Sequence, residues 1–176
     1  MCSSDLLEAM LMWGELDAVL VATPPAAHVP VALACLHEGV AVLCEKPFAL
    51  APDDARALLT AADQAGTVVT MAAKFRSVGD VIAAKELVDA GDLGEVLRFE
   101  NVFASRVDMR ARWNSDAAVS GGGVIVDNGT HSVDLARWFL GPITDVLATA
   151  GPRVQPLAVE DSATVLLRSE IGRAHV

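Results

Sequence analysis

Residues 121–134 carry the strongest chemical signal in the chain. They read Gly-Gly-Gly-Val-Ile-Val-Asp-Asn-Gly-Thr-His-Ser-Val-Asp. In a helix, Asp127 and His131 share one face because side chains four residues apart lie one turn above each other, and Asp134 continues the same stripe. Gly129 interrupts this helix at a cost of roughly 1 kcal/mol relative to alanine. A carboxylate, an imidazole and an unfavourable glycine together indicate a surface that a ligand approaches closely.

A second signal is Glu45-Lys46-Pro47, which directly follows the apolar run 40–43. It places a charged pair at the carboxyl end of a buried strand, where open α/β sheets bind ligands. Taken alone, such a turn is more often simply solvated, and an isolated Asp-x-x-x-His is more often a surface pair. The meaning of both signals therefore depends on the elements around them.

The first part of the chain predicts a parallel, doubly wound α/β sheet. Its apolar runs are continuous, as expected of parallel strands that are covered on both faces. Pro52 begins one helix, and Gly39 and Gly66 follow the ends of two helices, which agrees with the usual positions of these residues. The resulting β-α-β-α-β order implies right-handed crossovers. The expected strands are 17–22, 40–44 and 67–72, and the expected helices are 26–38, 52–65 and 78–90.

The second part predicts an α+β arrangement with a mostly antiparallel open sheet. Residues 94–104 alternate in side-chain character, which is typical of a strand with one solvated face. Residues 105–120 are polar and irregular, and the glycine-led helix follows and ends near residue 140. Two more strands are expected at 145–150 and 162–168. The fold class is therefore α/β, with a boundary between the two parts near residues 74–79.

Composition excludes several classes of function. The chain has 176 residues, 53% of them hydrophobic, which is enough for a packed core. No apolar run reaches the ~20 residues of a membrane span, so no membrane partner is expected. The net charge of −10 argues against a nucleic-acid partner. Cys35 and Cys44 lack metal-ligand spacing and are expected to be buried free thiols in a reducing, cytoplasmic compartment.

The two ends of the sequence can be back-translated into nucleotide strings that complement each other. The start can be back-translated as GTG TGC TCT TCC GAT CT, whose reverse complement encodes Ile-Gly-Arg-Ala-His, which is residues 171–175. The string also resembles a common sequencing-library adapter. We therefore interpret residues 1–5 and 171–176 as adapter-derived scars, with Leu6 and Glu170 at the junctions, and exclude them from fold reasoning. On this interpretation the chain is an internal piece of a longer protein, truncated at both ends.

Four motifs in order resemble the Gfo/Idh/MocA family (glucose–fructose oxidoreductase and inositol dehydrogenase). They are A-T-P-P-A-A-H (22–28), C-E-K-P (44–47), K-F-R (74–76) and the glycine-led stretch 121–134, and the resemblance covers residues 7–169. It implies that 6–76 is the C-terminal half of a Rossmann dinucleotide-binding domain and that 77–170 is an incomplete α+β domain for substrate binding and oligomerisation. It also implies NAD or NADP as cofactor, a polyol substrate and a homo-oligomer formed through the C-terminal sheet.

The resemblance also assigns roles to individual residues. The catalytic positions are Lys46, Asp127 and His131. The cofactor-binding positions are Ala22, Thr23, Pro24, His28, Glu45, Lys46 and Pro47. Candidate substrate-binding positions are Lys74, Trp113 and Asn128; the family usually has Asn or a similar residue where this chain has Lys74. No metal is expected, since Asp127 and His131 have no third ligand at a fitting spacing.

Alcohol oxidation explains why these residue types would be needed. Hydride leaves carbon for the nicotinamide, while a base such as His131 takes the hydroxyl proton. Asp127 or Asp134 could orient the imidazole, and Lys46 could stabilise developing negative charge. With Lys74 as a second ammonium group near the cleft, and Arg76 either structural or a third cation, a neutral or anionic polyhydroxy substrate is expected.

Two alternative functions remain open at this point. One is an NAD-assisted glycosidase, which some family relatives are. The other is a non-catalytic dinucleotide-binding sensor, which the joint presence of Lys46, Asp127 and His131 disfavours. The Gly-x-Gly-x-x-Gly turn and the residue that selects NAD or NADP do not occur in this sequence.

Overall fold

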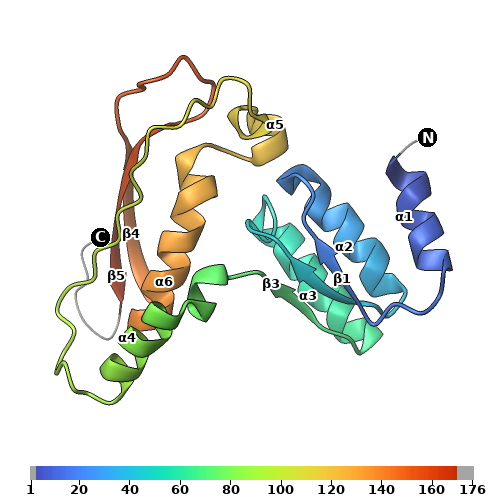
Figure 1. Ribbon diagram of the computed structural model, residues 1–176, viewed down its shortest axis with the longest axis horizontal. Coiled ribbons are helices and arrows are strands. Elements are labelled where there is room, and N and C mark those ends of the chain that lie inside the picture. Colours follow the sequence, from blue (N-terminus) through green and yellow to red (C-terminus); the bar gives the residue numbers. More distant parts are fainter. Residues whose placement is uncertain (1–2, 170–176) are drawn as a thin grey trace. The chain divides into compact units, whose positions relative to one another are not determined.

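The structure is a computed structural model that describes residues 3–169, and it divides into two compact units. The first comprises the described chain up to Ala72 together with Val119–Gly121. The second comprises Ala73–Ala118 and the described chain from Gly122 onward. Figure 1 shows the elements of both units, and each unit is described by itself below.

The first unit is built on a parallel three-stranded sheet of order β1-β2-β3, as predicted. In the register, Val21 lies opposite Cys44, which lies opposite Met71, so the carboxyl ends of the strands are aligned. The elements are α1 (Ser3–Met12), β1 (Ala18–Val21), η1 (Pro25–Ala27), α2 (His28–His37), β2 (Ala41–Cys44), α3 (Pro52–Ala65) and β3 (Val69–Met71).

Helix α1 was not predicted. Its Leu7 and Leu11 pack against the core of the first unit, which explains why this segment is ordered as a helix. The segment 1–5, interpreted from the sequence as a scar, overlaps α1 at residues 3–5. The corresponding segment 171–176 lies outside the described residues.

The core of the first unit lies between one face of the sheet and helices α2 and α3. Cys35 and Cys44 are both fully buried there and form no disulfide, which confirms the expectation of buried free thiols. Burial raises the pKa of the Cys35 thiol. Burial, assisted by the charge of Glu45, raises the pKa of Cys44 to about 11. The remaining core residues are Val21, Ala32, Leu36, Val40, Val42, Leu58, Ala61 and Ala62.

The opposite face of this sheet is largely exposed in the described chain. Leu20 lies opposite Leu43 in the register, and their side chains are 61% and 41% exposed. Val68, which precedes β3, is 64% exposed. Parallel sheets are usually covered on both faces, so this unit exposes apolar surface of a kind that folded domains ordinarily bury.

The second unit contains a long helix and an antiparallel strand pair. Its elements are η2 (Lys74–Ser77), α4 (Gly79–Asp89), η3 (Trp113–Ser115), a π-helical turn (Ile125–Gly129), α6 (Thr130–Leu140), β4 (Ile143–Ala150) and β5 (Ala163–Ser169). Helix α5 (Ala117–Ser120) lies at the division between the units. Leu147 is paired with Leu166 across the two strands, with a register shift between Ile143 and Asp145.

The prediction of a strand at residues 94–104 is wrong. Residues 96–109 form neither helix nor strand and run as an irregular segment, yellow-green in Figure 1. The alternation of side chains reflects packing on α6 instead: Phe99 stacks on Phe139 with ring centroids 5.5 Å apart, and Ser132 Oγ donates to Asn101 Oδ1 at 2.7 Å. A period of two therefore arose here from contacts with a helix rather than from a backbone ladder.

Among residues 3–169, no helix is both long enough and apolar enough to cross a bilayer.

Candidate active site

The carboxyl ends of β1 and β2 are joined in the first unit by the imidazole of His28. His28 is fully buried. Its Nδ1 lies 2.7 Å from the carbonyl oxygen of Pro47, and its Nε2 lies 2.8 Å from that of Thr23. His28 therefore connects the two loops for which the sequence predicted a cofactor-binding role.

The charged pair at the end of β2 is anchored by backbone hydrogen bonds. The Glu45 N–H donates to the Val21 carbonyl oxygen at 2.8 Å, and the Lys46 N–H donates to Glu45 Oε2 at 3.0 Å. The Lys46–Pro47 peptide is cis. Glu45, Lys46 and Pro47 are half-buried, whereas Ala22, Thr23 and Pro24 at the end of β1 are exposed.

In the second unit, Glu160 organises the start of the glycine-led helix. Its carboxylate accepts N–H bonds from Gly123 at 3.1 Å and Ile125 at 3.0 Å, and its carbonyl oxygen accepts the Val124 N–H at 2.9 Å. A carboxylate at a helix N-terminus satisfies otherwise free donors and interacts favourably with the helix dipole.

The glycine run reflects close approaches of the backbone. A Cβ at Gly123 would lie 1.9 Å from the Glu160 carbonyl oxygen, so only glycine fits that contact. Gly121 has a φ of 81°, and a Cβ there would lie 2.5 Å from Leu50 Cδ2 within the first unit. A Cβ at Gly129, in contrast, would meet Ile125 Cγ2 at an ordinary 3.5 Å. No described protein atom therefore requires glycine at position 129.

Replacing Gly123 by alanine is expected to destabilise the second unit by about 1–3 kcal/mol or more, the usual cost of overpacking. The obstructing atoms are backbone and cannot rotate away. Gly79→Ala is the matched control because a Cβ at Gly79 meets nothing within 4 Å and Gly79 opens helix α4. Urea unfolding measures both variants, and equal midpoints would contradict the close contact at Gly123.

A π-helical turn replaces the regular helix expected at Asp127. It spans Ile125–Gly129, and α6 continues from Thr130, whose Oγ1 donates to the Val126 carbonyl oxygen at 2.7 Å. Such turns are rare and frequently occur at functional sites. The turn presents Asp127 and Asn128, and both line a cavity of about 200 Å³ in the second unit.

This cavity includes a residue that the sequence reasoning missed. Asn114 lies on η3, is buried, and donates from Nδ2 to Asp127 Oδ2 at 3.4 Å. The only sequence signal near it was the adjacent Trp113, which the structure leaves 52% exposed. Asn114 lies in an irregular polar segment, where no periodicity distinguishes an inward side chain from a solvated one.

His131 is buried in the first turn of α6 against two aromatic rings. Its ring meets Phe75 edge-on at 5.0 Å between centroids, and Phe103 lies 6.2 Å away. Lys74 is exposed and its Nζ lies 5.0 Å from the centre of the Phe75 ring. Lys74 and His131 thus both contact Phe75 within the second unit, whereas Lys46 belongs to the first unit.

Asp134 has a different partner from the one considered for it. Both of its oxygens accept from Arg76, at 2.9 Å from Nε and 2.5 Å from Nη2. The guanidinium of Arg76 also lies 4.6 Å from the centre of the Trp138 ring. Arg76 is therefore structural rather than a free cation, and Asp127 remains the better candidate for orienting His131.

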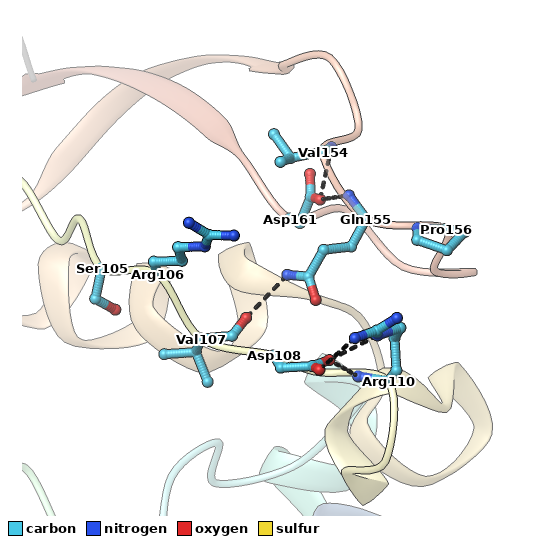
Figure 2. A pocket seen from close by; sticks show the side chains of 9 residues that line it. All are labelled: Ser105, Arg106, Val107, Asp108, Arg110, Val154, Gln155, Pro156 and Asp161. Carbon is cyan, nitrogen blue, oxygen red and sulfur yellow. Dashed lines mark hydrogen bonds and ion pairs between the residues drawn. The ribbon is translucent and has the colours of Figure 1, made fainter.

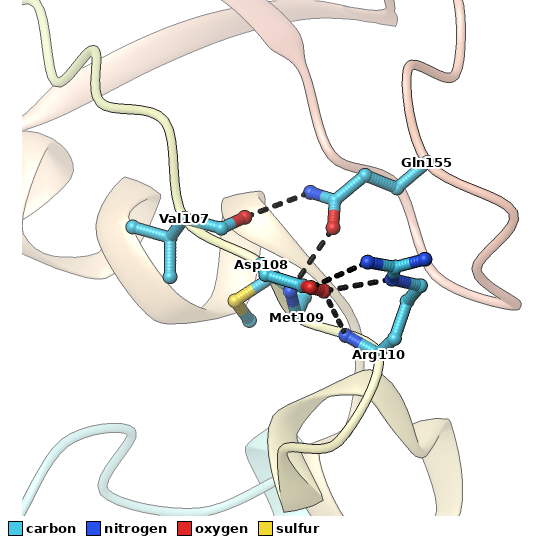
Figure 3. A network of polar contacts seen from close by, with 5 residues as sticks. All are labelled: Val107, Asp108, Met109, Arg110 and Gln155. Carbon is cyan, nitrogen blue, oxygen red and sulfur yellow. Dashed lines mark hydrogen bonds and ion pairs between the residues drawn. The ribbon is translucent and has the colours of Figure 1, made fainter.

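Two loops of the second unit, residues 105–110 and residues 153–161, are connected to each other by side-chain hydrogen bonds. Asp108 accepts two side-chain bonds from Arg110, at 2.9 and 2.6 Å, and these hydrogen bonds lower the pKa of Asp108 to about 2. Gln155 donates from Nε2 to the Val107 carbonyl oxygen and accepts the Met109 N–H, both at 3.0 Å (Figure 3). The side chain of Gln155 thus ties the segment 105–110 to the segment 153–161.

Between these two loops lies a second cavity, of about 470 Å³ (Figure 2). Asp161 lies at its edge, where Oδ2 accepts N–H bonds from Val154 at 2.8 Å and Gln155 at 2.7 Å. Asp161 also lines the smaller cavity that contains Asp127. The two cavities therefore share a wall.

The parallel sheet of the first unit and the glycine-led helix of the second are features of an oxidoreductase fold with a Rossmann-like sheet, and comparison with known proteins agrees. Residues 2–73 match the model of the oxidoreductase family with an NAD-binding Rossmann fold, and residues 81–175 match the GFO/IDH/MocA C-terminal domain. The chain belongs to the Gfo/Idh/MocA family.

Individual relatives support this assignment. The chain is 32% identical over 164 residues to an uncharacterized oxidoreductase of Schizosaccharomyces pombe, covering 92% of this chain and 44% of that protein. It is 31% identical over 169 residues to D-apiose dehydrogenase of Paraburkholderia graminis, covering 93% and 44%. The chain spans about half the length of the relatives it matches.

A solved structure shares the fold. The WlbA dehydrogenase from Bordetella pertussis, in complex with NADH and UDP-GlcNAcA, superposes with a TM-score of 0.85 at 28% identity, covering 97% of this chain and 55% of that one.

Proposed function

We propose that the whole protein is an NAD(P)-dependent oxidoreductase that transfers hydride between a nicotinamide and a carbinol or carbonyl carbon of a sugar, cyclitol or similar polyol. The observation that carries the proposal is the π-helical turn, which presents Asp127 to a polar cavity four residues before the buried His131. Family membership supports the same chemistry.

The first unit offers residues that suit one half of the cofactor. The Glu45 carboxylate can accept hydrogen bonds from ribose hydroxyls, and the exposed loop at Thr23 and Pro24 lies at the same sheet edge. His28 and the Glu45–Val21 bond hold this edge in place without the ligand. Since no Gly-x-Gly-x-x-Gly turn occurs in the sequence, these residues suit the nicotinamide-ribose half rather than the pyrophosphate.

The protein residues then have the following roles. A bound nicotinamide supplies hydride transfer. A ring nitrogen of His131 takes the proton of the substrate hydroxyl during oxidation and returns it during reduction. Asp127 stabilises the charged imidazole. The ammonium of Lys46 donates to the substrate oxygen and stabilises its developing negative charge.

Copies of the whole protein are proposed to associate through the C-terminal sheet. Val146 and Leu147 are adjacent in β4, so their side chains point to opposite faces of the strand. Both residues are exposed, at 64% and 67%. Because apolar side chains are exposed on both faces of this sheet, the proposed association has apolar surface to bury, against further strands of the whole protein or against a second copy.

A substrate panel tests the proposed activity. Sugars, cyclitols and their acids are offered to the whole protein with NAD and with NADP, and reduction is followed by nicotinamide absorbance. We expect turnover of at least one polyol. Activity confined to hydrophobic ketones or amines would contradict the proposal, and glycoside cleavage without net nicotinamide reduction would support the NAD-assisted glycosidase instead.

A further inference from the structure

Glu160 accepts three consecutive backbone N–H groups at the start of the glycine-led helix. Its carboxylate accepts those of Gly123 and Ile125, and its carbonyl oxygen accepts that of Val124. The first four N–H groups of a helix have no partner within the helix. A residue that follows 35–37 positions later in the chain therefore fixes the backbone of most of this first turn.

The same turn is connected to Asp127 by one further hydrogen bond. The Asp127 N–H donates to the Gly123 carbonyl oxygen at 2.9 Å. Gly123 is thus bonded to Glu160 through its N–H and to Asp127 through its carbonyl oxygen. Because a Cβ at Gly123 would lie 1.9 Å from the Glu160 carbonyl oxygen, the two backbones are in direct contact. A displacement of Glu160 would therefore reach Asp127 through a single intervening residue.

The backbone of Glu160 is itself held on both sides. Val159, which precedes it, is buried. Asp161, which follows it, accepts two backbone N–H groups through Oδ2, including that of Gln155 at 2.7 Å (Figure 2). The side chain of Gln155 in turn bonds to the backbone of the segment 105–110 (Figure 3). Glu160 therefore extends from a fixed loop and can anchor the start of the helix.

We propose that Glu160 is a positioning residue for Asp127. The proposal rests on the proposed function, in which Asp127 stabilises the charged imidazole of His131. Glu160 holds the turn in the arrangement from which Asp127 reaches the cavity that both residues line. Loss of the Glu160 carboxylate should therefore lower kcat, while the KM for the nicotinamide should change little because the residues proposed to bind the cofactor lie in the first unit.

Amide hydrogen exchange, followed by NMR on the full chain, tests the positioning without any turnover. Glu160→Met keeps most of the side-chain length but removes both accepting oxygens. We expect exchange at Gly123, Ile125 and Asp127 to become about ten- to a hundredfold faster in this variant, the factor that corresponds to a lost hydrogen bond to a charged group. Glu160→Gln keeps one accepting oxygen without the charge, so an increase of only about fivefold is expected, since charged hydrogen bonds are roughly twice as strong as neutral ones.

Glu86→Gln is the matched control for the loss of a negative charge. Glu86 lies on α4 in the same unit and is exposed, so exchange at the three amides should remain that of wild type. The amides of α4 also serve as a reference within each variant. If Glu160→Met exchanges rapidly throughout the second unit, the comparison between wild type and Glu160→Gln decides instead, with faster exchange at Asp127 as the expected result.

Steady-state kinetics of the whole protein then measure the functional effect. Glu160→Met should lower kcat by about 10²-fold, the effect that a small misplacement of a catalytic group can have, with a nicotinamide KM within about threefold of wild type. Glu160→Gln should recover part of this loss. Rates are measured well below the unfolding midpoint, where a role confined to stability would leave kcat unchanged.

Two outcomes would overturn the positioning role. One is unchanged exchange at Asp127 when Glu160 is replaced, and the other is a wild-type kcat in a variant whose Asp127 amide exchanges faster. If the wild-type whole protein turned over no polyol, the proposed function would fail, whereas the exchange data would still decide whether Glu160 fixes Asp127.

Discussion

Replacing His131 by alanine is expected to lower turnover of the whole protein by about 10²–10⁴-fold, the usual cost of losing a general base. The reason is that His131 is the only proton acceptor assigned to the substrate hydroxyl in the proposed mechanism. His131 packs against Phe75 and Phe103 in the second unit, so its replacement should leave the residues proposed to bind the cofactor in the first unit unchanged. Initial rates of nicotinamide reduction measure the loss, and cofactor affinity should change much less.

His37 provides the matched histidine control. It ends helix α2 and is exposed, so His37→Ala should retain the wild-type rate. The rate of His131→Ala should also respond to added imidazole if the missing group is a base. A His131→Ala rate within roughly threefold of wild type, far from the range for a lost base, would reject the assignment.

Replacing Lys46 by methionine is expected to lower kcat by about 10²–10³-fold, the typical effect of removing one group that stabilises developing negative charge. Methionine preserves most of the length and apolar stem of lysine but carries no ammonium. The backbone bond from Lys46 N–H to Glu45 is independent of the side chain, so the local loop should persist. Steady-state kinetics with the best polyol from the panel give kcat and KM separately.

Lys85→Met is the corresponding control. Lys85 lies on α4, forms an ion pair with Asp89 and has its Nζ 5.4 Å from the Trp138 ring centre. Its loss should affect stability slightly and turnover little. If Lys46→Met and Lys85→Met both retained wild-type kcat, the stabilising role of Lys46 would be excluded.

Much of the fold could be predicted because its signals are local. Pro52 and Gly66 mark both ends of α3, and Gly66 adopts the left-handed conformation, with a φ of 64°, that ends a helix. The continuous apolar runs became the parallel strands. The strand prediction for the segment 94–104 was wrong because alternation shows only which side chains face inward. In this segment the inward side chains contact helix α6 and not a neighbouring strand.

The candidate site was predictable only in part, for a related reason. The spacing of Asp127 and His131 is visible within one helix. The partner of Asp134, in contrast, is Arg76, which is 58 residues away in the sequence. Asn114 reaches Asp127 from an irregular segment. Contacts of this kind follow from how the segments pack, and one sequence contains no periodic pattern that reveals them.

The exposed sheet face of the first unit has a thermodynamic consequence. Leu20, Leu43 and Val68 already contact solvent in the folded chain, so unfolding adds little new apolar hydration at these positions. Apolar hydration is the main source of the heat-capacity increment of unfolding, about 0.45 cal/K/mol per Å². The increment of this unit should therefore be smaller than its length suggests, and its stability should vary less steeply with temperature on either side of its maximum.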